Sequence, residues 1–388
     1  MCVMHPQINE YNEILNEVRR FARNEIRPEA LDLDLYPDPA KIASLWRKSL
    51  DLDIPCLLLP QSCNGAGYPP LCGAFVLDVL ASECAGVASV FAHHLAASIP
   101  VSPEDHGRPQ YLVNILSKMD SGKLPVASVI FPSDMGDQAL FIQEKNSPCG
   151  SGPYGSDPWV INGESALVGN SSGADAFCAF IHEDDTRENI ACVFVEKNLP
   201  GIAIQEKLMI PGLKINPFGK ISFNQMEIAS DAVIASGKNG KNLMKQALNA
   251  YFGFIAAMAM GTARTAWTKA LSYAKQRYQF GDLIIRHGEI QRMLGVMKMK
   301  LDVGTAAYIQ VFQTDRVNLP GVTADGSLAK AYCTQAALEI VLDAIQIHGG
   351  YGYMHEYGLE KIMRDVKILQ LLGGRNPQHH VQAIAEEF

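Results

Sequence analysis

The chain has 388 residues, of which 48% are hydrophobic and 19% are charged, as expected for a globular protein with a large interior. A chain of this length predicts about two or three domains rather than one core. With 33 Lys and Arg against 41 Asp and Glu, the net charge of −8 excludes a broad basic surface for nucleic acid.

The N-terminal segment, residues 1–123, is predicted to be a helical domain. Apolar residues recur at helical spacing across residues 11–26, and Pro28 ends this stripe. Two further apolar helices are predicted at residues 74–91 and 109–120.

The character of the sequence changes at residues 124–236, which are predicted to form a small all-β domain. The dipeptide Asn162-Gly163 stands beside a β-prone run and predicts a hairpin turn. Residues 146–158 are rich in Gly, Ser and Pro, and we expect a surface insertion there. The other strand-like runs cover residues 177–181, 192–195, 202–205 and 220–223.

Helical periodicity returns in residues 237–388, which are predicted to form a C-terminal helical bundle. One seam of apolar residues continues over about six turns and is typical of a bundle helix. Its members are Ile290, Leu294, Met297, Leu301, Thr305, Tyr308 and Phe312. The predicted fold is therefore mostly α with a central β domain.

The cysteines and the N-terminus bear on where the protein works. The nine cysteines show no CxxC pair, which favours reduced thiols in a reducing compartment. The first residues lack the basic and apolar regions of a secretory signal, and no run approaches the ~18 apolar residues of a membrane span. We therefore expect a cytoplasmic protein with no membrane span, and the sequence contains no metal-ligand motif.

Three motifs in the last third of the chain carry a family resemblance. Residues 273–281 read YAKQRYQFG, residues 346–352 read QIHGGYG, and residues 364–368 read RDVKI. In this order they closely resemble the acyl-CoA dehydrogenase family, and the resemblance extends over essentially the whole chain. It implies an N-terminal helical domain, a middle β-barrel-like domain and a C-terminal four-helix bundle.

The resemblance also implies a function and its partners. Members of this family oxidise the Cα–Cβ bond of an acyl-CoA thioester with FAD as the hydride acceptor. An electron-transfer flavoprotein or a similar acceptor then takes the electrons. The implied assembly is a homo- or hetero-oligomer, either a dimer or a tetramer.

Two of the motifs are expected to bind FAD. Gly349 and Gly350 have no Cβ and let the backbone approach a bound group closely, and Arg277 offers a planar fork suited to a diphosphate. In the family, the residues that match Arg277 and Gln346 contact the FAD of the neighbouring subunit. Phe280, in the Phe-Gly of the same motif, is assigned to this site with them.

The sequence departs from the family where the flavin ring should lie. The family's Thr-Glu-Pro-Gly-x-Gly-Ser-Asp aligns with residues 130–137, which read IFPSDMGD. Backbone donors of Ile130 and Phe131 remain available to a flavin, but the hydroxyl groups are lost, and Ser133 compensates only from a shifted position. The threonine of a second flavin motif, Trp-Ile-Thr-Asn, aligns with Gly169.

Further departures lie at the C-terminal part of the flavin site. The glutamine that the family carries downstream of Phe-Gly aligns with Gly288. The threonine that follows the family's catalytic Glu-Gly aligns with Arg375, which we still assign to the cofactor site.

The catalytic glutamate itself is missing. Its usual position is Gly373, and the alternative position that some members use is Tyr251, so neither carries a carboxylate. A relocated base must then come from Tyr251, whose pKa is ordinarily near 10, or from His93 or His94, which are better matched in pKa. Each of the three is alternatively a packing residue. His379 and His380, in the C-terminal tail, are expected to face solvent.

Three functions are consistent with this sequence. The first is an acyl-CoA dehydrogenase-like flavoprotein with a relocated base. The second is a base-free variant such as an acyl-CoA desulfinase-like enzyme, in which Arg375 holds an anionic acyl tail. The third is a catalytically silent subunit paired with a catalytic paralogue.

Overall fold

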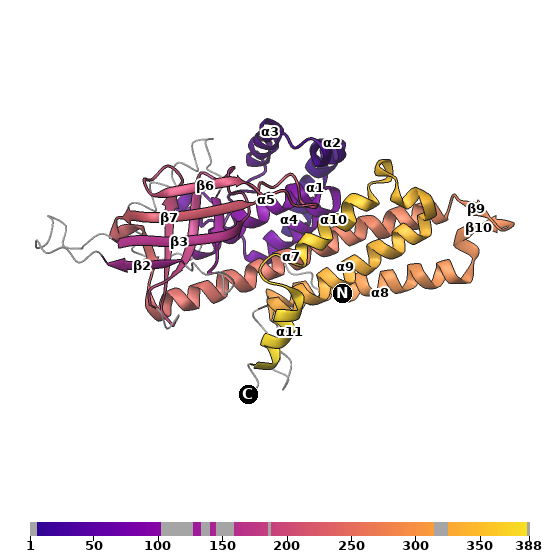
Figure 1. The fold of residues 1–388 in the computed structure, drawn as a ribbon. Coiled ribbons are helices and arrows are strands. Elements are labelled where there is room, and N and C mark those ends of the chain that lie inside the picture. The colour runs from indigo at the N-terminus through magenta and orange to yellow at the C-terminus, as the bar shows by residue number, and fades with distance from the viewer. Residues whose placement is uncertain are drawn as a thin grey trace, which may run out of the picture.

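The computed structural model describes residues 6–101, 127–132, 140–144, 159–184, 188–313 and 325–385. Along this part of the chain, a cluster of helices, a β sheet and a set of long helices follow one another. Figure 1 shows the sheet at one end of the molecule, the long helices extending away from it, and the first helices covering the junction. The predicted fold class, mostly α with a central β domain, is confirmed.

The N-terminal part consists of helices with a break that the sequence did not indicate. The predicted single helix at 74–91 is wrong, because the extended backbone of Cys84 (φ −159°, ψ 110°) separates two helices there. Gly86, directly after the break, lies in close contact with Ile215 of the β domain. The predicted helix at 109–120 lies outside the described residues. The helices are α1 (Pro6–Phe21), α2 (Ala30–Leu35), α3 (Pro39–Leu50), α4 (Pro70–Glu83) and α5 (Ala85–Ser98).

The β domain is one mostly antiparallel sheet. Its strand order is β6-β7-β3-β2-β4-β5-β8, and β1 pairs in parallel with the fully buried β4. The expected insertion at 146–158 lies outside the described residues. The strands are β1 (Ala127–Ile130), β2 (Phe141–Glu144), β3 (Trp159–Val168), β4 (Ala176–His182), β5 (Ile190–Glu196), β6 (Ile202–Lys207), β7 (Gly219–Ile228) and β8 (Val233–Ala235).

The predicted hairpin turn at Asn162-Gly163 is wrong. Both residues lie inside β3, where the pairing with β7 shifts in register between Ile161 and Gly163. The Asn162 side-chain oxygen accepts the backbone N–H of Gln225 at 2.8 Å. Asn162 therefore lies opposite a β-bulge in β7, where Asn224 and Gln225 face this one residue, and its side chain satisfies a backbone group that the ladder leaves open.

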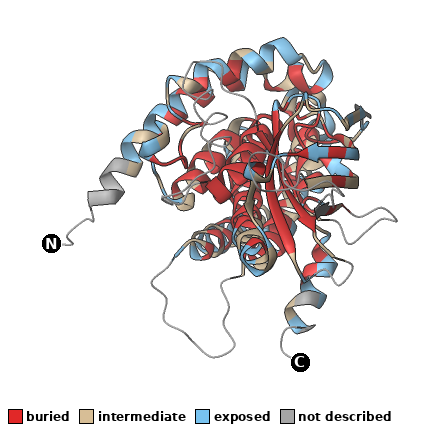
Figure 2. Ribbon diagram, turned by 90° about the vertical axis from the view of Figure 1, so that its left-hand side faces the viewer, coloured by how far each residue is buried: buried red, intermediate tan, exposed pale blue. Residues whose placement is uncertain are grey.

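The C-terminal part is a bundle of long helices. Of the predicted seam, Leu294, Met297, Leu301 and Tyr308 are buried, while the other members are half-buried. Figure 2 shows buried residues concentrated in the middle of the molecule and exposed residues along the outer helices. None of the described helices is long and apolar enough to cross a membrane. The helices are α7 (Gly237–Ala274), α8 (Gly288–Val311), α9 (Gly326–His348), α10 (Leu359–Leu369) and α11 (Asn376–Ala385).

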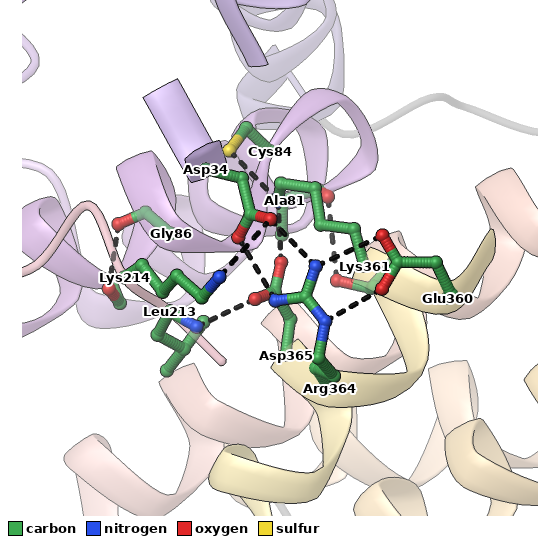
Figure 3. Close-up of polar contacts among 12 residues, drawn as sticks. Asp34, Ala81, Cys84, Gly86, Leu213, Lys214, Glu360, Lys361, Arg364 and Asp365 are labelled. Carbon is green, nitrogen blue, oxygen red and sulfur yellow. Dashed lines mark hydrogen bonds and ion pairs between the residues drawn. The ribbon is translucent and has the colours of Figure 1, made fainter. Parts of the chain in front are cut away.

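A buried network of charges ties the three parts together (Figure 3). On α10, Arg364 donates to Asp34 of α2 at 2.6 Å. Its neighbour Asp365 accepts the backbone N–H of Leu213, in the loop between β6 and β7, at 2.6 Å. Asp365 also pairs with Lys361 at 2.6 Å. The Arg-Asp motif read from the sequence therefore joins α10 to both the N-terminal helices and the sheet.

Candidate active site and cofactor pocket

A pocket of about 750 Å³ lies at the end of the helical bundle that is remote from the sheet (Figure 1). The end of α7, the hairpin of β9 (Tyr278–Gln279) and β10 (Asp282–Leu283), the start of α8 and the end of α9 surround it. Two of the sequence motifs meet here, because the predicted residues in its wall are Arg277, Phe280, Gln346, Gly349 and Gly350.

Arg277 and the two glycines of this pocket are open to a ligand. The guanidinium of Arg277 lies 5.8 Å from the centre of the Tyr351 ring, in a cation–π arrangement. Within the described residues, this guanidinium forms no ion pair. A Cβ added at Gly349 or Gly350 would find no atom within 4 Å, so the backbone there is open to a bound group. These residues fit the diphosphate of a dinucleotide such as FAD.

The Phe-Gly pair of the motif forms the tip of the β9–β10 hairpin. Both of its residues have positive φ, 52° at Phe280 and 85° at Gly281, as a two-residue hairpin turn of this kind requires. A phenylalanine rarely adopts this conformation, and this one is 93% exposed. The turn therefore projects a large apolar ring from the edge of the pocket.

A second group of predicted residues gathers around Tyr251, on α7. The Tyr251 hydroxyl lies 3.0 Å from Nε2 of His93, on α5, and both side chains are buried. His93 Nδ1 lies 2.7 Å from the carbonyl oxygen of Ser89, which can only accept, so Nδ1 carries the proton. His93 Nε2 is then the acceptor for the Tyr251 hydroxyl.

Burial sets the protonation state of this pair. It lowers the pKa of His93 to about 4 and raises the pKa of Tyr251 above its ordinary value. At neutral pH the pair is therefore a neutral imidazole and a neutral phenol. No described carboxylate forms a hydrogen bond with either group.

His94 has a different environment, although it adjoins His93. Its Nδ1 accepts the backbone N–H of Ala127 at 3.0 Å, and its Nε2 donates to the carbonyl of Pro55 at 3.0 Å. Both ring nitrogens are thus bound to main-chain groups of two other segments. In this arrangement, His94 holds β1 against the N-terminal helices and has no nitrogen left for a substrate.

The usual position of the catalytic glutamate lies against the same tyrosine. Gly373 has a φ of +67°, and a Cβ added there would lie 2.6 Å from Cε1 of Phe252 and 3.6 Å from Cε1 of Tyr251. The two residues that the sequence resemblance aligns with the family's base positions, Tyr251 and Gly373, are therefore adjacent, and the Phe252 ring fills the space of a side chain at 373. The helical periodicity of the sequence did not predict that the Phe252 ring occupies this space, although Phe252 directly follows Tyr251 in the sequence.

The predicted flavin-ring residues lie on the sheet side of this cluster. Ile130 is buried at the end of β1, and the Phe131 ring stacks on Phe180 and lies 5.7 Å from the Tyr251 ring. A Cβ added at Gly169 would lie 2.3 Å from His93 Nε2, so His93 excludes the family's threonine from that position. Ser133 lies outside the described residues.

The C-terminal tail corrects one expectation. His379 was expected to face solvent but is only 3% exposed, because its ring packs edge-on against Phe252 at 4.9 Å. Its Nε2 lies 3.2 Å from the Gly374 carbonyl. His380 and Arg375 are exposed, and Arg375 directly follows the glycine turn.

The helical–β–helical order, and the pocket that gathers Arg277, Gly349 and Gly350, are those that the resemblance of the sequence motifs to acyl-CoA dehydrogenases predicts. Models of the acyl-CoA dehydrogenase N-terminal and C-terminal domains match residues 9–122 and 238–387. This chain belongs to the acyl-CoA dehydrogenase family, whose members are oxidoreductases that act on CH–CH groups.

Named relatives and related solved structures each align with nearly the whole chain. An acyl-CoA dehydrogenase of Bacillus subtilis is 28% identical over 369 residues, which span 92% of this chain and 93% of the relative. A cyclohex-1-ene-1-carbonyl-CoA dehydrogenase of Geobacter metallireducens is 28% identical over 368 residues, 93% of each chain. The structure of butyryl-CoA dehydrogenase from Megasphaera elsdenii has a TM-score of 0.83 at 21% identity and 97% coverage of both chains, which establishes the shared fold.

Proposed function

We propose that this chain is an acyl-CoA dehydrogenase-like flavoprotein in which the Tyr251–His93 pair replaces the glutamate as proton acceptor. One observation carries the proposal. Tyr251 occupies one of the family's two glutamate positions, lies against the other at Gly373, and hydrogen-bonds to a histidine whose acceptor nitrogen faces it.

The pair acts as a two-step proton acceptor. The Tyr251 oxygen takes the proton that leaves the thioester, while the phenolic proton moves to His93 Nε2. The Ser89 carbonyl, bound to His93 Nδ1–H, holds the ring in the required tautomer and stabilises the imidazolium that forms. FAD, when bound, supplies the hydride acceptor for Cβ.

The strength of this base limits the substrate. With a pKa of about 4, His93 is a weaker final proton acceptor than a histidine in water. The reaction therefore favours thioesters whose departing proton is acidified by conjugation with a further double bond. In the substrate named for the Geobacter metallireducens relative, a cyclohex-1-ene-1-carbonyl thioester, Cα carries no hydrogen. The acidified proton is on the allylic ring carbon Cγ, and the hydride would leave from the saturated ring carbon bonded to Cα, which gives a conjugated diene. This thioester belongs in the test panel.

The FAD site in this proposal is shared between subunits. Arg277, Gln346, Gly349 and Gly350 bind the diphosphate end, and Ile130 and Phe131 offer main-chain groups toward the ring. The FAD complex of PigA, which has a TM-score of 0.83 with this chain at 21% identity, supports the cofactor assignment. An electron-transfer flavoprotein or a similar acceptor completes the cycle.

The test begins with the purified protein. A flavin absorbance spectrum, before and after reconstitution with FAD, reports the cofactor. A dye-coupled assay with saturated acyl-CoAs and cyclohex-1-ene-1-carbonyl-CoA reports oxidation. The proposal predicts a yellow protein whose rate is highest with the conjugated thioester. A protein that remains colourless after reconstitution overturns it.

Two tyrosine variants then test the pair. Tyr251→Phe removes the hydroxyl and should lower kcat/KM by about 100-fold or more, the range of general acid–base catalysis. Tyr308→Phe is the matched control, because Tyr308 is also buried but donates to Asp78 at 2.9 Å, away from this cluster. Equal losses of activity in both variants would contradict the role of Tyr251.

A second candidate is a catalytically silent subunit that completes the FAD site of a paralogue. It is favoured by the contrast between the open pocket at Arg277 and the space at Gly373, which Phe252 fills. Co-expression with the paralogue distinguishes it: turnover would then require the paralogue and survive Tyr251→Phe. The base-free alternative is tested in the same assay, where a sulfinate-bearing acyl-CoA would release sulfite without reducing the dye.

A further inference from the structure

One buried lysine binds the turn that replaces the catalytic glutamate. Lys330, on α9, is fully buried, and its Nζ donates to the carbonyl of Gln370 at 2.9 Å and to that of Gly374 at 2.5 Å. These carbonyls stand at the two ends of the turn that follows α10. The last carbonyls of a helix lack partners within it and carry partial negative charge, so a cation is favourable there.

Lys330 has no acidic partner among the described residues. Burial lowers its pKa to about 7. Lys361 is the contrasting case: burial opposes its charge as well, but Asp365, 2.6 Å away, holds its pKa above the ordinary value. The charge of Lys330 is therefore balanced by main-chain dipoles alone, and those dipoles belong to the turn.

We propose that Lys330 is the positioning residue of this turn, residues 371–374, and that its ammonium holds Gly373 against the Tyr251–Phe252 face of α7. The inference deepens the proposed function, since in that function the turn is a wall of the thioester site. Through Lys330, helix α9 controls the shape of that wall, although α9 contributes no catalytic group.

The position of Lys330 predicts opposite effects of pH on two quantities: the local stability of the turn and the free energy of unfolding of the whole protein. Hydrogen bonds from an ammonium are roughly twice as strong as those from a neutral amine. A local opening of the turn that leaves Lys330 buried therefore becomes easier as Lys330 loses its proton above pH 7. Folding as a whole becomes more favourable over the same range, because the unfolded lysine keeps its proton up to about pH 10.4 while the native state no longer buries a charge. If opening of the turn instead exposed Lys330 to solvent, protection of the turn and the free energy of unfolding would rise together with pH.

Other titratable groups near Lys330 do not produce this pattern. His379, on α11, shares the Gly374 carbonyl with Lys330, and burial together with the Lys330 charge lowers its pKa to about 4. It is therefore neutral between pH 6 and 8.5. Asp325, which precedes α9 and interacts electrostatically with His379, caps the helix through the backbone N–H of Ser327 at 2.7 Å.

Amide hydrogen exchange of the full-length protein tests the proposal without any ligand. The amides of Leu371, Leu372 and Gly374 are hydrogen-bonded and report the turn. Lys330→Met should raise their exchange rates by about 10- to 100-fold and leave the amides of α8 unchanged. In the wild type, their protection should fall between pH 6 and 8.5 after correction for intrinsic exchange, while the free energy of unfolding rises relative to Lys330→Met.

Lys269→Met is the matched control. Like Lys330, Lys269 donates from Nζ to main chain, here to the single carbonyl of Tyr357 at 2.8 Å, and burial of its amino group lowers its pKa. The residue as a whole is more exposed than Lys330 and lies away from the turn. Faster exchange at the turn in this variant as well, or no change in Lys330→Met, overturns the proposal. If Lys330→Met does not fold, the wild-type pH series and Lys330→Gln, which keeps two N–H donors without the charge, give the same decision.

The affinity for butyryl-CoA, measured by isothermal titration calorimetry on the wild type and on Lys330→Met, separates this inference from the proposed function. Weaker binding to Lys330→Met by about tenfold, together with faster exchange at the turn, supports both. If exchange responds as expected but butyryl-CoA and the other thioesters of the panel bind to no form of the protein, Lys330 still positions the turn and the thioester function fails.

Discussion

Gly373→Ala measures how firmly the position of the catalytic glutamate is closed. The substitution adds one methyl group, and two costs follow from the structure. A residue other than glycine at φ +67° costs about 1–2 kcal/mol. The new Cβ would also lie 2.6 Å from the Phe252 ring, and overpacking of this kind costs about 1–3 kcal/mol more. The expected loss of stability is therefore about 2–5 kcal/mol.

Gly358→Ala separates the two costs. Gly358 has nearly the same φ, +68°, but its added Cβ meets only the ends of two flexible side chains, Leu31 at 3.3 Å and Lys269 at 3.8 Å. It should cost the backbone strain alone, about 1–2 kcal/mol. The excess cost at Gly373 then measures the clash, and it should disappear when Gly373→Ala is made in a Phe252→Ala background.

Urea unfolding followed by fluorescence gives these values as shifts of the midpoint at constant slope. Gly373→Ala must lose more stability than Gly358→Ala, and the double variant must recover the difference. If Gly373→Ala costs no more than Gly358→Ala, the Phe252 ring does not occupy that space. The argument that the base position is closed would then fail.

Three further predictions concern other parts of the molecule. Asp365→Asn leaves the Lys361 ammonium buried without its partner and should lower the free energy of unfolding, measured with urea, by about 3–5 kcal/mol. The control Glu289→Gln breaks the exposed ion pair with Arg292 and should leave the urea midpoint unchanged. The free energy of unfolding should fall as pH drops from 6.5 to 4, and His93 should contribute up to roughly 3 kcal/mol of this fall. The reason is that the native state keeps this histidine neutral, while the unfolded chain takes up a proton. A flat profile of unfolding free energy against pH would contradict the burial of His93. Arg277→Gln should weaken FAD retention by about tenfold or more in an ultrafiltration assay. It should change the free energy of unfolding of the apoprotein by no more than about 1 kcal/mol, because this guanidinium forms no ion pair among the described residues and has only the cation–π contact with Tyr351 to lose.

The fold was predictable because its signals are local and repeated. The apolar seam of the helix at 288–311 and the motifs around Arg277 and Gly349 each encode one element, and together they define the architecture. Errors arose where one residue changes the local path of the chain. Cys84 breaks an apparently continuous apolar helix, and Asn162 bonds across to a neighbouring strand instead of closing a hairpin.

The candidate site was predictable only in part, because its contacts are long-range. Residues 93 and 251 are far apart in sequence, and no spacing rule relates them. His379 reads as a polar tail residue until α11 packs its ring onto Phe252. Lys330 has no distinctive neighbours in sequence, because its partners are main-chain carbonyls about 40 residues downstream. A side chain that binds backbone leaves no complementary residue for a sequence pattern to reveal.

At two positions where the family resemblance implies a side chain, a neighbouring ring occupies the space instead. Gly169 stands where the resemblance implies a threonine and lies against the His93 ring, and Gly373 stands where it implies a glutamate and lies against the Phe252 ring. Loss of two side chains without compensation would leave cavities, each of which costs stability in proportion to its volume. Here each lost side chain is filled by a large neighbour, so neither family residue returns by a single substitution without a collision. In the proposed function, the proton acceptor is therefore sought in Tyr251 and His93, which lie beside these two glycines.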